Sequence, residues 1–124
     1  MGNQQQDIVR SFLDCVAAGD FEAAVDHYAE DVTVHVSAWQ DPVVGKEAVR
    51  QALQREVGLS DYRYTILHIA SADAVTFIEV VDKFKRGDKD ITMHWSGVWE
   101  IDHEGRITAR RDYWDTKEYE AQLA

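Results

Sequence analysis

Residues 74–114 read AVTFIEVVDKFKRGDKDITMHWSGVWEIDHEGRITARRDYW, and this stretch decides the fold. Val, Ile, Thr and aromatic residues, which favour strands, dominate three runs that are separated by short turn signals. The runs are Ala74–Phe84, Ile91–Ile101 and Ile107–Trp114, and the turns are Arg86-Gly87-Asp88 and His103-Glu104-Gly105. Consecutive strands joined by short turns pair with their neighbours, so this stretch predicts an antiparallel meander.

Two further strands and three helices are expected before these runs. One strand is Asp61–Ala70, which joins the meander through the turn Ser71-Ala72-Asp73. The other is Asp31–Trp39, where Val32, Val34 and Val36 alternate with polar residues. The helices are Asp7–Ala18, ended by Gly19, then Phe21–Ala29, capped by Asp20, and a third that begins after Gly45. Helices followed by long consecutive strands indicate an α+β fold, with the helices on one face of a strongly curved sheet. We expect one domain over residues 1–124.

The composition of the chain limits which binding partners and which cellular compartment we expect for it. The chain has 124 residues, 45% of them apolar, which is enough for one sizeable core. A formal net charge of −10 disfavours binding to nucleic acid or to anionic membranes. Cys15 is the only cysteine, which excludes an internal disulfide and a cysteine-based metal cluster. The polar N-terminus lacks an apolar leader segment, so we predict a cytoplasmic protein.

Hairpin register predicts which side chains of the meander share a face, because alternate residues of a strand point the same way. Pairing Lys85 with Asp90 and Ile101 with Arg106 sets both hairpins. The resulting opposite pairs are Val80 and Trp95, Asp82 and Met93, Trp95 and Asp112, and Met93 and Trp114. The shared face collects Val80, Asp82, Phe84, Met93, Trp95, Arg110, Asp112 and Trp114. Two acids therefore lie diagonally within a mostly apolar, aromatic surface.

The pair Asp82 and Asp112 is the sharpest chemical signal in the sequence. An ionised carboxylate in apolar surroundings must be paired, or else its pKa rises. Two nearby carboxylates also oppose joint ionisation, so one can stay protonated as an acid while the other acts as a base. The structural alternative is that Arg110 forms an ion pair with Asp112 while Asp82 lies in water at the open end of its strand.

The strand at Asp31–Trp39 adds a histidine to the candidate residues. His35 and Ser37 share a face with Trp39, opposite the valine row. A histidine can transfer protons near neutral pH, although a lone histidine on a strand is more often structural or exposed. The five histidines show no metal-ligand spacing, and the chain lacks a glycine-rich phosphate loop and a serine nucleophile elbow. We therefore expect no metal and no cofactor.

With the meander and the acid pair in place, the chain resembles the NTF2-like superfamily of cone-shaped pockets. Within that superfamily it is similar to the limonene-1,2-epoxide hydrolase and SnoaL-like branch, over nearly the whole chain. The motifs that carry the resemblance are Glu79-Val80-Val81-Asp82, Gly97-Val98-Trp99-Glu100-Ile101, Gly105-Arg106-Ile107-Thr108 and Arg111-Asp112-Tyr113-Trp114-Asp115. Weaker matches are Ala29-Glu30-Asp31-Val32 and Gly45-Lys46-Glu47-Ala48-Val49.

The resemblance implies roles for five positions. Asp82 corresponds to the acid that protonates an epoxide oxygen, and Asp112 to the base that activates a water. Val80 stands where the family has an arginine that links the two acids. His35 and Ser37 stand where it has the tyrosine and the asparagine that hold the water.

Arg110 lies on the same face as Asp112 and is a candidate to supply the missing guanidinium. We accordingly expect an acid–base enzyme for a small apolar molecule, cyclic and terpenoid-like or polyketide-like, with epoxide hydrolysis as the leading reaction. The expected catalytic residues are Asp82, Asp112, His35 and Arg110, and the expected substrate contacts are Ser37, Trp39, Val80, Phe84, Met93, Trp95 and Trp114.

The sequence leaves two alternative functions open and also predicts an oligomeric state. The same pocket could isomerise, cyclise or dehydrate a substrate by removing a proton next to a carbonyl, with His35 or Asp112 as base. The domain could also bind a ligand without catalysis, because fold does not dictate function. The second face of the meander carries Val75, Phe77, Val81 and Val98, and together with the resemblance it predicts a homodimer.

Overall fold

The computed structural model describes residues 2–54 and 59–124. The helices in this part of the chain are α1 (Gly2–Ala17), α2 (Phe21–Val25), α3 (Lys46–Gln54) and α4 (Thr116–Leu123). The strands are β1 (Tyr28–His35), β2 (Val43–Val44), β3 (Leu59–Ala72), β4 (Val75–Arg86), β5 (Lys89–Ile101) and β6 (Ile107–Trp114). The predicted α+β class is confirmed. No helix in the described ranges is long and apolar enough to cross a membrane.

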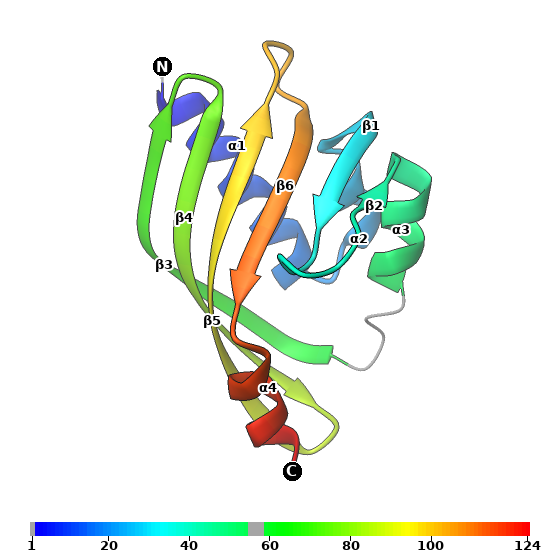
Figure 1. Ribbon diagram of the computed structural model, residues 1–124, viewed down its shortest axis with the longest axis vertical. Coiled ribbons are helices and arrows are strands. Elements are labelled where there is room, and N and C mark those ends of the chain that lie inside the picture. Colours follow the sequence, from blue (N-terminus) through cyan, green and yellow to red (C-terminus); the bar gives the residue numbers. More distant parts are fainter. Residues whose placement is uncertain (1, 55–58) are drawn as a thin grey trace.

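The strands of the described residues form one six-stranded mixed sheet in the order β2-β1-β6-β5-β4-β3. Strands β3 to β6 form the predicted antiparallel meander, whereas β1 lies parallel to β6. As a result β6, the last strand in the sequence, lies inside the sheet with a neighbour on each side. Figure 1 shows the long strands β3, β4 and β5 curving around the helices.

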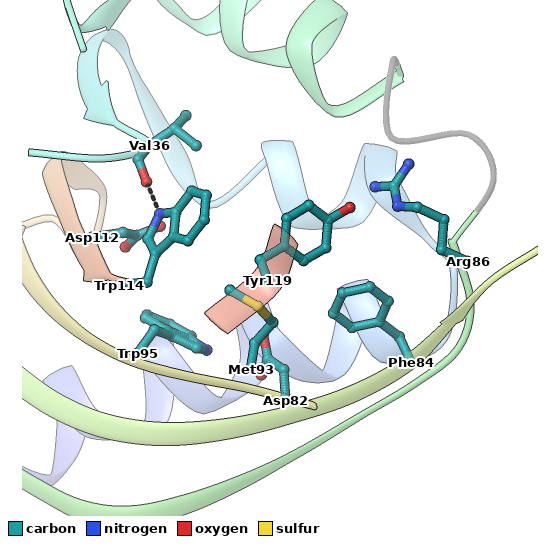
Figure 2. A pocket seen from close by; sticks show the side chains of 9 residues that line it. All are labelled: Val36, Asp82, Phe84, Arg86, Met93, Trp95, Asp112, Trp114 and Tyr119. Carbon is teal, nitrogen blue, oxygen red and sulfur yellow. Dashed lines mark hydrogen bonds between the residues drawn. The ribbon is translucent and has the colours of Figure 1, made fainter. Parts of the chain in front are cut away.

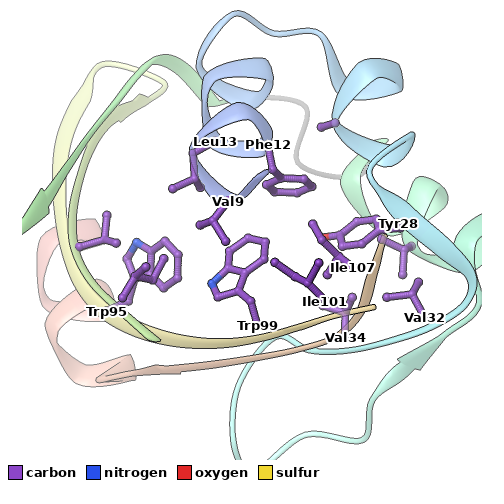
Figure 3. Close-up of a cluster of buried hydrophobic side chains, with 14 residues drawn as sticks. Val9, Phe12, Leu13, Tyr28, Val32, Val34, Trp95, Trp99, Ile101 and Ile107 are labelled. Atoms are coloured by element: carbon purple, nitrogen blue, oxygen red, sulfur yellow. The ribbon is translucent and has the colours of Figure 1, made fainter. Parts of the chain in front are cut away.

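The core lies between this curved sheet and helix α1, as Figure 3 shows. Val9, Phe12 and Leu13 are buried on one side of α1, and their spacing of three and four residues is that of a helix with one apolar face. Trp99 of β5 is fully buried beneath them, with its ring centroid 5.3 Å from that of Phe12. Apolar side chains therefore fill the space between α1 and the concave side of the sheet.

Two predicted boundaries in the first half of the chain were wrong. Helix α2 ends at Val25 instead of Ala29, because Tyr28 pairs with Ile107 and starts the buried strand β1. Strand β1 ends at His35 instead of Trp39, and residues 36–40 form bends and turns. Helix α4 was not predicted at all, and none of its residues is fully buried, so it carries no apolar stripe of the kind that reveals a helix.

The predicted register is confirmed in one hairpin and wrong in the other. Lys85 pairs with Asp90, so Val80 lies opposite Trp95 and Asp82 opposite Met93, as expected. In the next hairpin Ile101 pairs with Ile107 instead of Arg106, and a bulge after Glu100 adds a second residue of offset. Asp112 therefore lies opposite Gly97, and Trp114 opposite Trp95.

Helix α4 lies against the end of β5 that extends beyond β6. The side-chain amide of Gln122 accepts a hydrogen bond from the Thr92 N–H at 2.8 Å and donates one to the Thr92 carbonyl at 2.7 Å. Glu118 accepts the N–H of His94 at 2.8 Å. These side chains hold α4 near the β4–β5 turn, at the opposite end of the sheet from the β5–β6 turn (Figure 1).

Candidate active site

A cavity of about 240 Å³ opens on the concave side of the sheet, and we call it the first chamber. It is lined by Val36, Asp82, Phe84, Arg86, Met93, Trp95, Asp112, Trp114 and Tyr119. Six of these residues belong to the eight that register placed on one face of the meander. Figure 2 shows the two acids on separate walls, with Trp95 and Trp114 between them.

Asp112 forms an ion pair with Arg110, which precedes it by two residues on β6. The Nε of Arg110 lies 3.0 Å from Oδ1 of Asp112, and the two side chains are 13% and 14% exposed. The guanidinium packs over the rings of Phe12, Trp95 and Trp99, with its central carbon 4.2 Å from the Trp99 centroid. Alternate residues on a strand share a face, so sequence spacing alone brings this pair together.

A second contact holds the other side of the Arg110 guanidinium. Its Nη1 donates to the hydroxyl of Tyr28 at 3.3 Å, and Tyr28 is itself almost completely buried. Burial raises the pKa of Tyr28, which keeps its phenol neutral, while the charge of Arg110 opposes that rise. Arg110 is thus held by a carboxylate, a phenol and three aromatic rings, which define its orientation.

Gly97 makes room for the rings of Trp95 and Trp99 beside the carboxyl of Asp112. A Cβ atom at Gly97 would lie 2.8 Å from the Trp95 ring and 2.9 Å from Nε1 of Trp99, both closer than side chains allow. The same position is 3.4 Å from Oδ1 of Asp112, the residue directly opposite in β6. A glycine is therefore required where two indoles and the carboxyl converge.

Asp82 has a different set of partners. The hydroxyl of Tyr62, on β3, donates to Oδ1 of Asp82 at 2.8 Å. The Trp95 indole has no partner within hydrogen-bond limits among the described residues, yet its nitrogen edge is the one turned toward Asp82 in Figure 2. No cation of the described ranges forms an ion pair with Asp82, whereas Asp112 has Arg110.

Burial acts on the two carboxyls in the same direction, but different groups oppose it. Burial raises the pKa of Asp112, and the directly bonded guanidinium of Arg110 opposes that rise. Burial also raises the pKa of Asp82. The nearby indole N–H of Trp95, the hydroxyl of Tyr62 and the more distant charge of Arg110 oppose that rise. The negative charge of Asp112 adds to the rise at Asp82. The two carboxyls therefore differ in what opposes the effect of burial, which is a bonded guanidinium at Asp112 and chiefly neutral groups at Asp82.

A cavity of about 160 Å³, which we call the second chamber, lies on the other side of Asp112. It is lined by Tyr28, Val34, Val36, Val43, Val49, Ala52, Leu53, Arg110 and Asp112, from β1, β2, α3 and β6. Val36 and Asp112 line both chambers. Asp112 therefore has a cavity on each side, whereas Asp82 borders the first chamber.

Four residues expected at the site lie elsewhere. Val80 is fully buried and belongs to the core, and Ser37 is buried with no partner for its hydroxyl among the described residues. Trp39 is 68% exposed, and His35 lines neither chamber. For His35 the reason is the alternation of side chains along β1. Val32 and Val34 face the core, so His35 points to the opposite side of the sheet.

Several residues of the site were missed. Tyr62 and Tyr64 are alternate residues of β3, and Tyr64 pairs with Asp82. The register of the β3–β4 hairpin could therefore have placed both tyrosines on the face that carries Asp82. Tyr28 was hidden by its assignment to a helix. Val36 turns toward the chambers where β1 has ended, and Tyr119 comes from the unpredicted helix α4. Among the described residues there is no group of three or more His, Cys, Asp or Glu that could hold a metal ion.

Comparison with known proteins agrees with this architecture. A family model described as the SnoaL-like domain matches residues 9–110. An LEH-like epoxide hydrolase from M. tuberculosis is similar in structure, with a TM-score of 0.84, 23% sequence identity, and coverage of 98% of this chain and 93% of the other. SalBIII, an epoxide hydrolase/cyclase-like enzyme with a role in pyran ring formation in polyether salinomycin, has a TM-score of 0.84, 17% identity and 94% coverage of each chain. At these identities the two structures support the cone fold.

Proposed function

Because this chain belongs to the SnoaL-like domain family, within the NTF2-like fold, we propose that it is an enzyme that opens an epoxide by acid–base chemistry. The substrate is a small, mostly apolar molecule, since the first chamber is walled chiefly by Phe84, Met93, Trp95 and Trp114. Asp112 is the base and Asp82 is the acid.

One observation carries this proposal: Arg110 contacts one of the two acids and not the other. A guanidinium at 3.0 Å favours the ionised form of Asp112, which a base requires. Asp82 has neutral donors and a charged neighbour of the same sign, so it is the acid that retains a proton. Groups whose surroundings separate their protonation states are the mark of paired acid and base catalysis.

The reaction follows from these protonation states. Ionised Asp112 removes a proton from water while the water oxygen forms a bond to one epoxide carbon. The bond between that carbon and the ring oxygen breaks, its electron pair moves to the oxygen, and the oxygen takes the proton of Asp82. The product is a vicinal diol. One proton has passed from Asp82 to Asp112 in total, and it must return before the next turnover.

Tyr62 positions the acid in this scheme. Its hydroxyl occupies Oδ1 of Asp82, so the proton needed for catalysis is carried by the other carboxyl oxygen. Burial raises the pKa of Tyr62, and its hydrogen bond to Asp82 raises it further, so the phenol stays a donor. This arrangement leaves one defined O–H group for the epoxide oxygen.

A second candidate reaction is ring closure, in which a hydroxyl of the substrate replaces water as the nucleophile. It is favoured by the positions of His35 and Ser37, which the resemblance assigned to holding water but which line neither chamber. The same base and acid would then produce a cyclic ether from a hydroxy-epoxide, with no water incorporated. Both reactions open an epoxide, and they differ in the nucleophile.

The decisive experiment measures turnover of limonene 1,2-epoxide, cyclohexene oxide, styrene oxide and 5,6-epoxyhexan-1-ol in water labelled with ¹⁸O. Hydrolysis gives a diol with one labelled oxygen, and ring closure gives an unlabelled cyclic ether. Asp112→Asn and Asp82→Asn should each lower kcat/KM by about 10²–10⁴-fold, the usual contribution of a positioned proton-transfer group.

The matched control is Asp88→Asn, which removes an exposed carboxyl from the β4–β5 turn and should leave kcat/KM unchanged. Wild-type turnover in either chamber variant would refute the assigned roles. If no epoxide is opened, the proposed reaction is wrong. Exchange of deuterium into a carbonyl substrate would instead support proton removal next to a carbonyl.

We further propose that the chain forms a homodimer through the outer face of the sheet. Leu67, Phe77 and Tyr113 are large apolar residues exposed on β3, β4 and β6, and all three point away from the chambers. Several large apolar side chains exposed on one face of a sheet favour association with a second surface. Sedimentation velocity at micromolar concentration should give the mass of a dimer, and Phe77→Glu should convert it to a monomer. A monomeric wild type would contradict this proposal.

A further inference from the structure

The second chamber is an apolar cavity with its polar groups on one wall. Val34, Val43, Val49, Ala52 and Leu53 form the apolar walls, and the polar groups are Tyr28, Arg110 and Asp112. A concave, mostly apolar lining with a few polar groups is typical of a site for a small molecule. An apolar cavity of about 150 Å³ in another protein admits a benzene ring, which sets the scale for a volume of about 160 Å³.

The two chambers meet at Asp112. Trp114 donates its indole N–H to the carbonyl of Val36 at 2.7 Å, and this hydrogen bond crosses the space beside Asp112 in Figure 2. Val36 and Asp112 contribute to both cavities, whereas Trp114 contributes to the first. A group that reacts at Asp112 would therefore have an apolar space on each side.

The charge in the second chamber is already neutralised. Arg110 is its cation, and it is paired with Asp112 and hydrogen-bonded to Tyr28. A charged ligand group placed there would compete with that ion pair in surroundings of low polarity, which is unfavourable. The chamber is therefore suited to an uncharged alkyl chain or ring.

We propose that the two chambers hold the two ends of one substrate, an elongated and mostly apolar molecule whose reacting group lies between two apolar arms. One arm occupies the first chamber, and the second arm, no larger than about a benzene ring, occupies the second. This inference rests on the proposed function for the identity of the reacting group. The chamber's role as a binding site is tested separately from turnover.

Binding is measured first, by quenching of tryptophan fluorescence with two diols that need no chemistry. 1,2-Hexanediol carries one four-carbon arm, and 5,6-decanediol carries two. Each buried methylene contributes enough that a second four-carbon arm should tighten binding by about 10²-fold. Equal dissociation constants for the two diols would overturn the inference, whether or not any epoxide is opened.

Ala52→Phe places a ring in the second chamber and should abolish the preference for the two-armed diol. The matched control is Gln51→Phe, which adds the same ring one residue away on the exposed side of α3 and should keep the preference. Leu53→Ala enlarges the chamber and should shift the optimum to a longer second arm, which tests the site if the first variant fails to fold. An unchanged preference in a folded Ala52→Phe protein would refute the proposal.

Turnover then separates this inference from the proposed function. The same comparison uses 1,2-epoxyhexane and 5,6-epoxydecane, with kcat/KM as the readout. If Asp112 is required for both epoxides but the second arm brings no gain, the second chamber is not a substrate site and the proposed reaction stands. If the two-armed diol binds more tightly but neither epoxide is opened, the chamber is a binding site and the proposed reaction is wrong.

Discussion

The two carboxyls of the first chamber differ in what surrounds them more than in where they lie. Asp112 has a cation from its own strand, at 3.0 Å, and that cation is enclosed by aromatic rings. Asp82 has a phenol from β3 and an indole from β5, both neutral. The same residue type on the same face therefore meets a charged partner in one place and neutral partners in the other, while burial raises the pKa of both carboxyls. The difference indicates that the proposed roles of Asp82 and Asp112 depend on the side chains that contact them. Each of these contacts can be removed by a substitution.

The largest effect on stability is expected from Asp112→Asn. The substitution leaves the Arg110 guanidinium buried without its carboxylate, and loss of one partner of a buried ion pair typically destabilises a protein by about 3–5 kcal/mol. Urea unfolding at pH 7 measures this change. A loss of stability no larger than that of the exposed variant Asp88→Asn would mean that the ion pair does not distinguish the two acids.

Arg110→Met tests the same pair from the other side and should destabilise the protein less than Asp112→Asn. A carboxyl left alone can neutralise itself by taking up a proton, whereas a guanidinium cannot. Without the guanidinium the pKa of Asp112 rises. A base must be ionised, so kcat/KM should be lost at a higher pH on the acidic side of the profile. An unchanged acidic limb would show that Arg110 does not control Asp112.

Asp82→Asn should change how the stability of the protein depends on pH. Burial raises the pKa of Asp82, so above the ordinary aspartate range the folded protein binds more protons than the unfolded chain. The stability of the wild type then falls as the pH rises from about 4 through the folded-state pKa. The variant lacks this titration and should gain on the wild type over that window. A stability difference that stays constant with pH would contradict the proposed protonation of Asp82.

The smallest effect is expected from Tyr62→Phe, and it lies mainly in the pH profile. Removing the donor raises the pKa of Asp82, and because an acid must be protonated, kcat/KM should persist to a higher pH on the basic side. Turnover should fall several-fold, since one hydrogen bond between neutral groups contributes about 0.5–1.5 kcal/mol. Tyr64→Phe is the matched control, because its hydroxyl bonds Asp14 outside both chambers. A basic limb that moves equally in both variants would rule out a specific role for Tyr62.

The fold and the acid pair could be predicted because their signals are local. The turn at Gly87 and Asp88 is short, so it determines the β4–β5 register without further information. The β5–β6 hairpin contains a longer turn and a bulge, and neither is evident from alternation. Each adds one residue of offset, and a total of two leaves every side chain on its predicted face. Asp112 is therefore inside the cone although its predicted partner was wrong.

The remaining errors concern contacts between segments distant in sequence. The apolar and polar rows of β1 were recognised, but the side of the sheet that each row faces is set by packing against α1 and β6. Alternation alone therefore did not show that His35 lines neither chamber. Tyr28 is buried by its pairing with Ile107, which is 79 positions later in the chain. Tyr62 reaches Asp82 across a pair of strands whose ladder is interrupted by two irregularities. Such contacts depend on the assembled sheet.

Helix α4 has a consequence for how the molecule avoids other copies of itself. An unpaired strand edge is a template for another strand, and the end of β5 beyond β6 would be such an edge. Gln122 and Glu118 occupy its backbone groups, and Tyr119 of the same helix packs on Trp114 and lines the first chamber. Substitutions that detach α4 should therefore expose the aggregation-prone edge of β5 and, at the same time, open the wall of the first chamber.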